Sequence, residues 1–409
     1  MAKQKIPQPY GTCVVLATEC NDYVRFLYQP FRSPYGPETY GASETSNPAL
    51  SMLLNYGKYY RVWPFAHVEH NRLYASIALF RPYVKPLCRL FQSNDYGGSW
   101  NEIADFYSMD RRNTTTGQPF VTRDGIVLIP VWSVGFYTHG TLWFAIYRSS
   151  DSGLSWQKTY EDSEGTYGKH FFQSSDGNLY IGVGLGGGGS EGRVSPTPGR
   201  SYLLRSEDMG KTWRRILKVD YPTALYSGAV LNDKTVLVAA REKKSLFLSE
   251  NGGETWKEVL MGNTTRSVSY IEELHKTVVT SNSALFFSED SLNWTQLRVP
   301  IKGLTLRYPT WFEGKLYMSS VGWHCYVIST DLNKWYFDLD VTRVTRSNLG
   351  ARMAVLSDYL FVGDEANGTL VRAKLPFDSN ISVNLRQVFR GNINYLAALA
   401  KYVRARMIN

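Results

Sequence analysis

The sequence contains few cysteines and no long apolar run. Only four of its 409 residues are cysteine, at positions 13, 20, 88 and 325, and none belongs to a Cys-x-x-Cys pair. Four cysteines are too few for a disulfide framework in a chain of this length, so buried free thiols are favoured over a Cys13–Cys20 pair. No run of 18 apolar residues occurs, which argues against a transmembrane segment. The basic N-terminus is not followed by the apolar stretch of a secretory signal.

Charged residues are also scarce. They make up 20% of the chain, against 43% hydrophobic and 14% aromatic residues, which favours a large core built from strands over a disordered chain. Lys and Arg exceed Asp and Glu by 45 to 36, a net charge of +9. Because no long Lys/Arg run occurs, an ordinary solvated surface is favoured, and nucleic acid is a candidate partner only through this basic charge.

One short pattern occurs six times along the chain. Each copy has a Ser, an Asp or Asn two residues later, and a Trp at its end. The first four copies also carry Gly and then Ser or Thr, whereas the last two are one residue shorter and lack the glycine. The copies are SNDYGGSW (93–100), SSDSGLSW (149–156), SEDMGKTW (206–213), SENGGETW (249–256), SEDSLNW (288–294) and STDLNKW (329–335).

These residue types predict the turn of a β-hairpin. Asp and Ser oxygens accept hydrogen bonds from turn amides, and Gly supplies a positive φ. A large rigid Trp ring then fills space between neighbouring sheets. We therefore expect structural roles for the Asp or Asn and the Trp of each copy, which are Asp95, Trp100, Asp151, Trp156, Asp208, Trp213, Asn251, Trp256, Asp290, Trp294, Asp331 and Trp335.

The repeat resembles the Asp-box, or BNR, repeat Ser-x-Asp-x-Gly-x-Thr-Trp of sialidases, sortilin-type receptors and related β-propellers. The resemblance implies a propeller whose repeat turns lie on the rim, away from the binding site. It also implies that the repeated Asp residues neither catalyse a reaction nor bind Ca²⁺.

The spacing of the repeat predicts a single all-β propeller of four-stranded antiparallel blades. Successive repeat Trp residues lie 56, 57, 43, 38 and 41 positions apart, which fits one blade per copy. Two further units, residues 11–65 and 350–390, lack a good copy, although 55–60 looks like a decayed one. Eight blades are favoured. Seven result if the N-terminal region is an extension or shares a blade with the C-terminal strands.

The extent of the repeat units divides the chain into three predicted parts. Residues 1–10 form an N-terminal tail and residues 11–390 form the propeller. Residues 391–409 form a basic tail, in which apolar residues at helical spacing predict a short amphipathic helix.

The resemblance to sialidases also implies a catalytic pattern. It consists of an Arg triad for a substrate carboxylate, an acid/base Asp, and a Tyr nucleophile paired with a Glu. The first Arg belongs to a Phe/Tyr-Arg-Ile-Pro motif, to which Phe31-Arg32-Ser33-Pro34 is similar. Arg32 is therefore the catalytic candidate of a sialidase-like reading. Against it, Ser33 replaces an aliphatic residue, and Arg32 follows a second strand instead of entering an inner one.

Three other arginines form a candidate anion site. Arg266, Arg307 and Arg352 each lie near the start of the first strand of three consecutive units, and such positions surround the channel of a propeller. Three guanidinium groups there would bind a carboxylate or phosphate. The alternative is three unrelated arginines on the surface or between blades, because neighbouring strand residues face opposite ways.

The histidines predict neither a metal site nor a cofactor. Only His67 and His70 are close in sequence, and residues three apart on one strand point to opposite faces. No Ser/His/Asp or Cys/His arrangement occurs, so we expect no metal and no cofactor.

The absence of a full catalytic pattern favours a non-catalytic binding or assembly module. Its partners would be other protein subunits of an assembly, or a glycan or other anionic ligand. One version of this module is a virion protein, such as a phage tail or nozzle component or a receptor-binding protein. A virion or extracellular location is therefore favoured. A sialidase-like glycosidase and a secreted glycan- or protein-binding receptor domain are the alternatives.

Overall fold

The computed structural model describes residues 51–375 of the chain with internal gaps. These gaps are residues 57–59, 80–85, 134–142, 165–166, 185–200, 220–222, 224, 233, 241–243, 283, 300–304, 322–325, 334 and 341–350. The predicted tails (1–10 and 391–409), Arg32, Cys13, Cys20 and Cys325 all lie outside the described residues. Cys88 is a buried free thiol.

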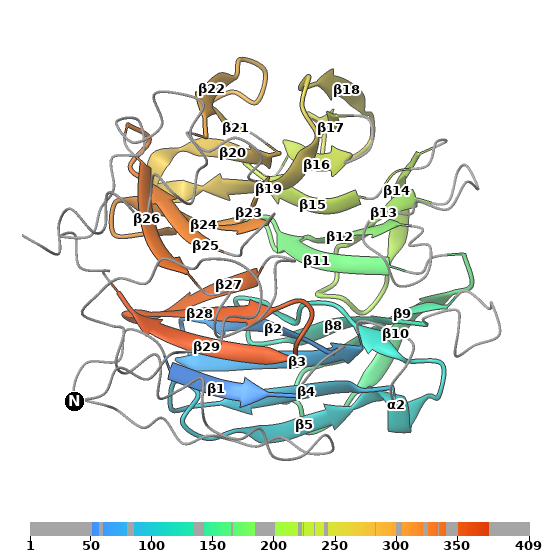
Figure 1. Cartoon of the computed structure of the whole chain (residues 1–409). Coiled ribbons are helices and arrows are strands. Elements are labelled where there is room, and N and C mark those ends of the chain that lie inside the picture. The colour runs from blue at the N-terminus through green and yellow to red at the C-terminus, as the bar shows by residue number, and fades with distance from the viewer. Residues whose placement is uncertain are drawn as a thin grey trace, which may run out of the picture.

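The described strands form seven antiparallel sheets arranged as the blades of a propeller (Figure 1). Six sheets contain four strands. In the remaining sheet the short strands β6 (Thr115–Thr116) and β7 (Phe120–Val121) both pair with β8 (Val127–Trp132) and together occupy the inner position. The inner strands of most neighbouring blades contact one another around the centre. The predicted all-β propeller of four-stranded blades is thus confirmed, with seven blades.

The strands of each blade follow one another in sequence from the centre outward, except in the last blade. Blade 1 contains β2 (Tyr60–His67), β3 (Arg72–Leu79), β4 (Cys88–Ser93) and β5 (Asn101–Asp105). Blade 2 contains β6 (Thr115–Thr116), β7 (Phe120–Val121), β8 (Val127–Trp132), β9 (Phe144–Ser149) and β10 (Gln157–Asp162). Blade 3 contains β11 (Tyr167–Gln173), β12 (Leu179–Gly184), β13 (Ser201–Ser206) and β14 (Arg214–Val219).

Blades 4 to 6 repeat the same order. Blade 4 contains β15 (Leu225–Val230), β16 (Val236–Ala240), β17 (Ser245–Ser249) and β18 (Lys257–Leu260). Blade 5 contains β19 (Thr265–Ile271), β20 (Lys276–Ser281), β21 (Ala284–Ser288) and β22 (Thr295–Arg298). Blade 6 contains β23 (Thr305–Phe312), β24 (Lys315–Val321), β25 (Tyr326–Thr330) and β26 (Trp335–Asp340).

Blade 7 combines strands from both ends of the described chain. It contains β27 (Ala351–Leu356), β28 (Tyr359–Asp364), β29 (Thr369–Lys374) and, outermost, β1 (Ser51–Asn55). Figure 1 shows β1, in blue, beside the red β29. The favoured count of eight was wrong because β1 completes the last blade, which is the seven-blade alternative. The strand β1 ends at Asn55 and β2 of blade 1 begins at Tyr60, so the sequence 55–60 does not fall between two strands of one blade.

The hydrophobic core lies between blades. One cluster packs Leu90 of blade 1 against Ile129 of blade 2, and another packs Leu203 of blade 3 against Val238 of blade 4. All four side chains are fully buried. The centre of the ring is therefore left for a cavity.

The six repeat copies form the turns between the third and outer strands of blades 1 to 6. In the second copy, Ser149 Oγ accepts from the Gly153 amide at 2.8 Å, and Asp151 Oδ1 accepts from the Ser155 amide at 2.9 Å. Gly153 has φ +94°, which an L side chain rarely adopts. The side chains thus satisfy amides that the turn leaves without backbone partners.

The repeat Trp residues contact the blade before their own. Trp156 Nε1 of blade 2 donates to the Ile103 carbonyl of blade 1 at 3.1 Å, and Trp256 Nε1 of blade 4 donates to the Ile216 carbonyl of blade 3 at 3.0 Å. Trp335 packs in the cluster between blades 5 and 6 and is 3% exposed. Each such ring joins two adjacent sheets.

Two short helices complete the described structure. The α-helix α2 (Phe106–Met109) follows β5, and the 3₁₀ helix η1 (Glu272–Leu274) follows β19. Among the described residues, no helix has the length and apolar character needed to cross a membrane.

Asp208 shows how a repeat turn responds to pH. Partial burial acts to raise its pKa, but hydrogen bonds from the Thr212 hydroxyl and amide outweigh burial and hold the pKa at about 2. Because this folded-state pKa lies below the ordinary value of 3.8, the carboxylate stabilises the fold fully above about pH 4. This stabilisation is lost as the pH falls from about 4 toward 2.

Substitutions at Asp208 should separate charge from hydrogen bonding. Asn251 occupies the same place in another turn and accepts the equivalent amide bond at 2.9 Å. We therefore expect Asp208→Asn to keep stability at pH 7 within about 0.5 kcal/mol and to flatten the acid dependence. Asp208→Ala should lose about 1 kcal/mol at pH 7. Urea midpoints measured from pH 2 to 7 test this, and an unchanged acid dependence in Asp208→Asn would contradict it.

Candidate functional site

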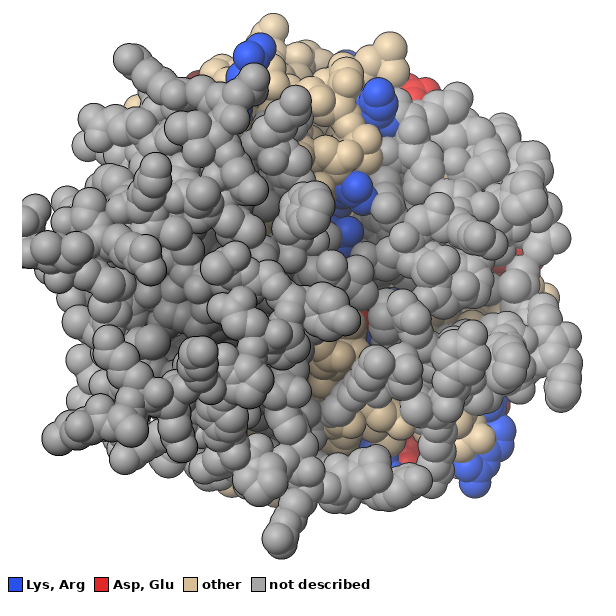
Figure 2. Space-filling view, in the orientation of Figure 1, with Lys and Arg blue, Asp and Glu red and all other residues tan. Residues whose placement is uncertain are grey.

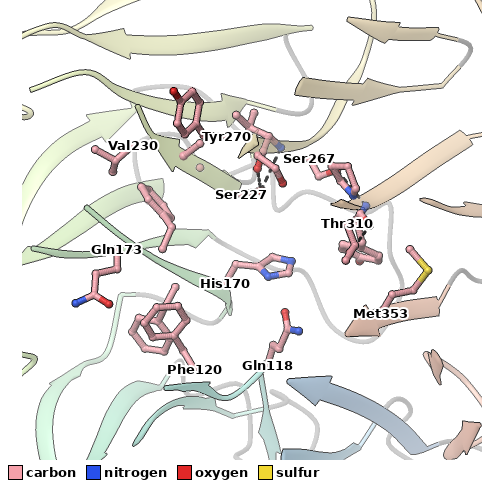
Figure 3. A pocket seen from close by; sticks show the side chains of 18 of the residues that line it. Gln118, Phe120, His170, Gln173, Ser227, Val230, Ser267, Tyr270, Thr310 and Met353 are labelled. Carbon is pink, nitrogen blue, oxygen red and sulfur yellow. Dashed lines mark hydrogen bonds between the residues drawn. The ribbon is translucent and has the colours of Figure 1, made fainter. Parts of the chain in front are cut away.

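The inner strands of all seven blades line a central cavity of about 520 Å³. Figure 3 shows side chains from different blades pointing into this space, with His170 near its middle. A smaller cavity of about 250 Å³ adjoins it and shares Gln118, Phe120, His170, Phe171 and Met353. One lining residue from each blade, taken in order, is His67, Phe120, His170, Ser227, Tyr270, Tyr308 and Met353.

Hydrogen bonds between inner strands hold part of this lining in place. Ser227 Oγ of β15 donates to the Val268 carbonyl of β19 at 2.9 Å and accepts from its amide at 3.2 Å. Ser267 Oγ of β19 accepts from the Tyr308 amide of β23 at 3.2 Å. These side chains join blades 4, 5 and 6 at the cavity wall, so the wall is pre-formed.

A fully buried carboxylate lies beside the cavity. Glu365, which follows β28, is 0% exposed. Its carboxylate lies 3.5 Å from Arg352 Nε and 3.6 Å from Arg307 Nη1, and it accepts a hydrogen bond from Tyr308 Oη at 2.9 Å. Two guanidinium groups and one carboxylate leave this cluster with one positive charge.

A bulge in β23 brings two consecutive residues to the same carboxylate. Arg307 and Tyr308 would face opposite sides of a regular strand. The pairing of β23 with β24 shifts register between Arg307 and Thr310, and Tyr308 has a left-handed φ of 55°. Strain of this kind needs support from its surroundings and is typical of functional sites.

Arg352 connects the charged cluster to the cavity. Its guanidinium lies 4.5 Å from the ring centre of Trp63 and 4.4 Å from that of Tyr308. Nη1 donates to Gln118 Oε1 at 3.1 Å and also contacts the His170 ring. Nη2 is buried and has no hydrogen-bond partner among the described residues. Arg352 is therefore a fully buried cation in the wall of the cavity, and it places the positive charge of the cluster beside that space.

The structure separates the three arginines of the candidate anion site. Arg266, Arg307 and Arg352 are each the second or third residue of an inner strand. Arg307 and Arg352 share Glu365, whereas Arg266 Nε donates to Asn282 Oδ1 at 2.7 Å. Only Arg352 of the three lines the cavity.

Sequence reasoning missed four residues of this site, which are Gln118, His170, Tyr308 and Glu365. A signal for Glu365 does exist, because two acids, Asp364 and Glu365, directly follow the apolar stretch Tyr359–Gly363. Both acids are buried. Nothing comparable marks Gln118 or His170.

His67 and His70 lie together, which corrects the expectation that they face opposite ways. The strand β2 ends at His67, and the chain turns before β3 begins at Arg72. Their Nδ1 atoms lie 2.9 Å apart and their rings stack with centres 4.6 Å apart. Burial, and then the neighbouring charge of His70, lowers the pKa of His67.

The described surface gives no particular support to a nucleic-acid partner. Figure 2 shows Lys and Arg side chains at several separate places among the described residues of one face. Exposed cations pair with carboxylates elsewhere, as Arg214 does with Glu207 and Lys257 with Glu250, both at 2.8 Å.

Removal of the buried charge should destabilise the fold strongly. We expect Glu365→Gln to lose about 3 kcal/mol of unfolding free energy, because it leaves two buried guanidinium groups without their carboxylate. Glu164→Gln is the matched control. Its exposed ion pair with Arg215, at 2.6 Å, should contribute about 0.5 kcal/mol or less. Chemical denaturation of both variants tests this, and equal losses would be the contrary result.

The comparisons identify the fold and no family. No family model matches the sequence, and no curated protein matches it. A structure of YCF48 bound to D1 peptide is 11% identical with a TM-score of 0.55, covering 81% of this chain and 97% of its own.

Two lyase structures are similar to about the same degree. Catalytically inactive virginiamycin B lyase from Staphylococcus aureus with quinupristin is 10% identical with a TM-score of 0.56, covering 80% of this chain and 99% of its own. A streptogramin B lyase is 8% identical with a TM-score of 0.54, covering 80% and 97%. The chain therefore shares a propeller fold with both peptide-binding and catalytic proteins.

Proposed function

We propose that the chain is a non-catalytic binding module whose central cavity holds a segment of a partner protein. The observation that carries this proposal is the cavity itself, to which all seven inner strands contribute. Pre-formed clefts of several hundred Å³ with mixed walls are typical ligand sites in proteins. YCF48, which shares the fold, binds a peptide.

The cavity wall suits the chemistry of a peptide. Phe120, Phe171 and Met353 offer apolar surface for a side chain, whereas Gln118 and Ser269 offer polar groups for the backbone. Arg352 adds a buried cation to the cavity wall. We infer that the bound segment places a carboxylate or carbonyl oxygen against Arg352.

A narrower form of the proposal makes the partner another subunit of a virus particle, as in a phage tail or nozzle. The net charge of +9 and the low charged fraction are compatible with packing into a larger assembly. A secreted receptor domain for a glycan or protein would use the same cavity. Genes for portal or tail proteins beside this one would support the virion form, and a secretory leader in the native gene would support the receptor form.

Blocking the cavity should abolish peptide binding. Ser269 lies on the inner strand β19 and lines the cavity, whereas Thr295 is exposed on the outer strand β22 of the same blade. From a random peptide library displayed on phage, the wild-type chain should select a set of peptides. Ser269→Trp should weaken their binding by about 100-fold or more, because the indole occupies their space, and Thr295→Trp should not.

Two results would contradict the proposal. Peptides that bind Ser269→Trp as tightly as the wild type would place the binding surface elsewhere. A library that yields no binder to the wild type would argue against a peptide ligand.

A sialidase-like glycosidase is the second candidate, and one contact favours it. Tyr308 donates to Glu365 at 2.9 Å beside Arg307 and Arg352, which resembles the sialidase pairing of a Tyr nucleophile with a Glu and nearby arginines. However, no Asp is among the described residues that line the cavity, so the acid/base group of that pattern is not found there. This is why binding without catalysis is preferred.

An activity assay separates the two candidates. If the glycosidase reading holds, the chain should release the fluorophore from a fluorogenic sialoside, and Tyr308→Phe should lower kcat by about 1000-fold or more. Absence of turnover by the folded wild-type chain is expected from the binding module.

A further inference from the structure

Three potential metal ligands meet at the turn between β2 and β3. His67 is the last residue of β2, and Glu69 and His70 belong to the turn that follows. The Nδ1 atoms of the two histidines lie 2.9 Å apart, and His67 Nε2 lies 3.9 Å from Glu69 Oε2. One ligand atom from each residue lies within 4.8 Å of the others.

The backbone fixes this arrangement. The pairing of β2 with β3 extends to His67 opposite Arg72, so a four-residue turn must connect them. The Asn71 amide closes the turn by donating to the Val68 carbonyl at 3.1 Å, with Asn71 at a left-handed φ of 50°. A tight turn of this kind brings residues 67 and 70 to the same side, which a continuing strand would not do.

The burial of the three residues also fits a site with one anchored and two adjustable ligands. His67 is 6% exposed, and its buried Nε2 makes no hydrogen bond among the described residues. Glu69 and His70 are exposed. Nε2 is the nitrogen of His67 that faces the Glu69 carboxylate, so it is the atom placed to share an ion with that carboxylate. Arg72, the nearby cation on β3, donates to Ser152 Oγ at 2.9 Å.

We propose that His67, Glu69 and His70 bind a divalent transition-metal ion of the Zn²⁺ type. Two imidazole nitrogens and one carboxylate oxygen are a donor set that Zn²⁺ takes in proteins, with a further position left for water or another ligand. His67 and Glu69 also line the central cavity, so the ion would lie at its exposed end. Without an ion, the two Nδ1 atoms form a hydrogen bond with each other, and this is the competing state.

Metal titration of the full chain tests the proposal. The chain is treated with a chelator, dialysed, and titrated with Zn²⁺ against a chromophoric indicator that competes for the ion. We expect His70→Ala to weaken Zn²⁺ binding at this site by about 100-fold or more, since loss of even an outer-shell partner costs 10- to 100-fold. His275→Ala is the control, because His275 is exposed, lies outside the cluster, and should leave binding unchanged.

A second readout keeps the test independent of folding. His67 is buried and its replacement could unfold the turn, so the exposed residues carry the test, and Glu69→Gln should weaken binding as His70→Ala does. Zn²⁺ should raise the Tm of the wild type and of His275→Ala but not that of His70→Ala. Equal Zn²⁺ affinity and an equal rise in Tm in His70→Ala and the wild type would overturn the proposal. Ser269→Trp should still bind Zn²⁺, so failure of the peptide proposal would not remove the metal site.

Discussion

The pairing of β1 with β29 is the constraint on which the rest of the structure depends. It adds a strand from the start of the described chain to a sheet from its end, with Ser51 opposite Arg372 and Asn55 opposite Thr369. Blades 7 and 1 pack closely against each other. A Cβ added to Gly363 of blade 7 would lie 2.2 Å from the Val62 carbonyl oxygen of blade 1. Only when blades 7 and 1 are in contact do seven inner strands surround one cavity.

The chemistry of the cavity extends across the contact between blades 7 and 1. Arg352 of blade 7 stacks on Trp63 of blade 1 and bonds to Gln118 of blade 2. A buried guanidinium needs compensation, and Glu365 supplies it within the same blade. The Glu365 carboxylate also accepts a hydrogen bond from Tyr308 and lies near Arg307. Its position therefore depends on blade 6 as well. The site is thus assembled by blades that are far apart in sequence, and it should lose its geometry if the ring opens.

The sequence predicted the fold better than the site, and the reason is physical. The repeat is local: its Ser, Asp and Trp act within one turn or on the adjacent blade, so seven or eight consecutive residues carry the signal. The seven-blade alternative was right and the preference for eight was wrong, because the pairing of β1 with β29 joins residues more than 300 positions apart and nothing in residues 51–55 identifies the partner strand. Most residues of the site could not be predicted from the sequence for the same reason. Arg352 was predicted near the channel, but its partner Glu365 and the turn that joins His67 to His70 depend on where strands end.

The repeat Trp residues give the ring a direction. Each described contact that a repeat Trp makes with another blade runs to the preceding one, as from Trp156 to Ile103 and from Trp256 to Ile216. In the first blade, Trp100 packs against the cluster that contains Leu53 of β1. An open solenoid built from such one-way contacts would need a special capping repeat at each end. Here the first blade rests on the last, so every blade has a predecessor and the array needs no cap.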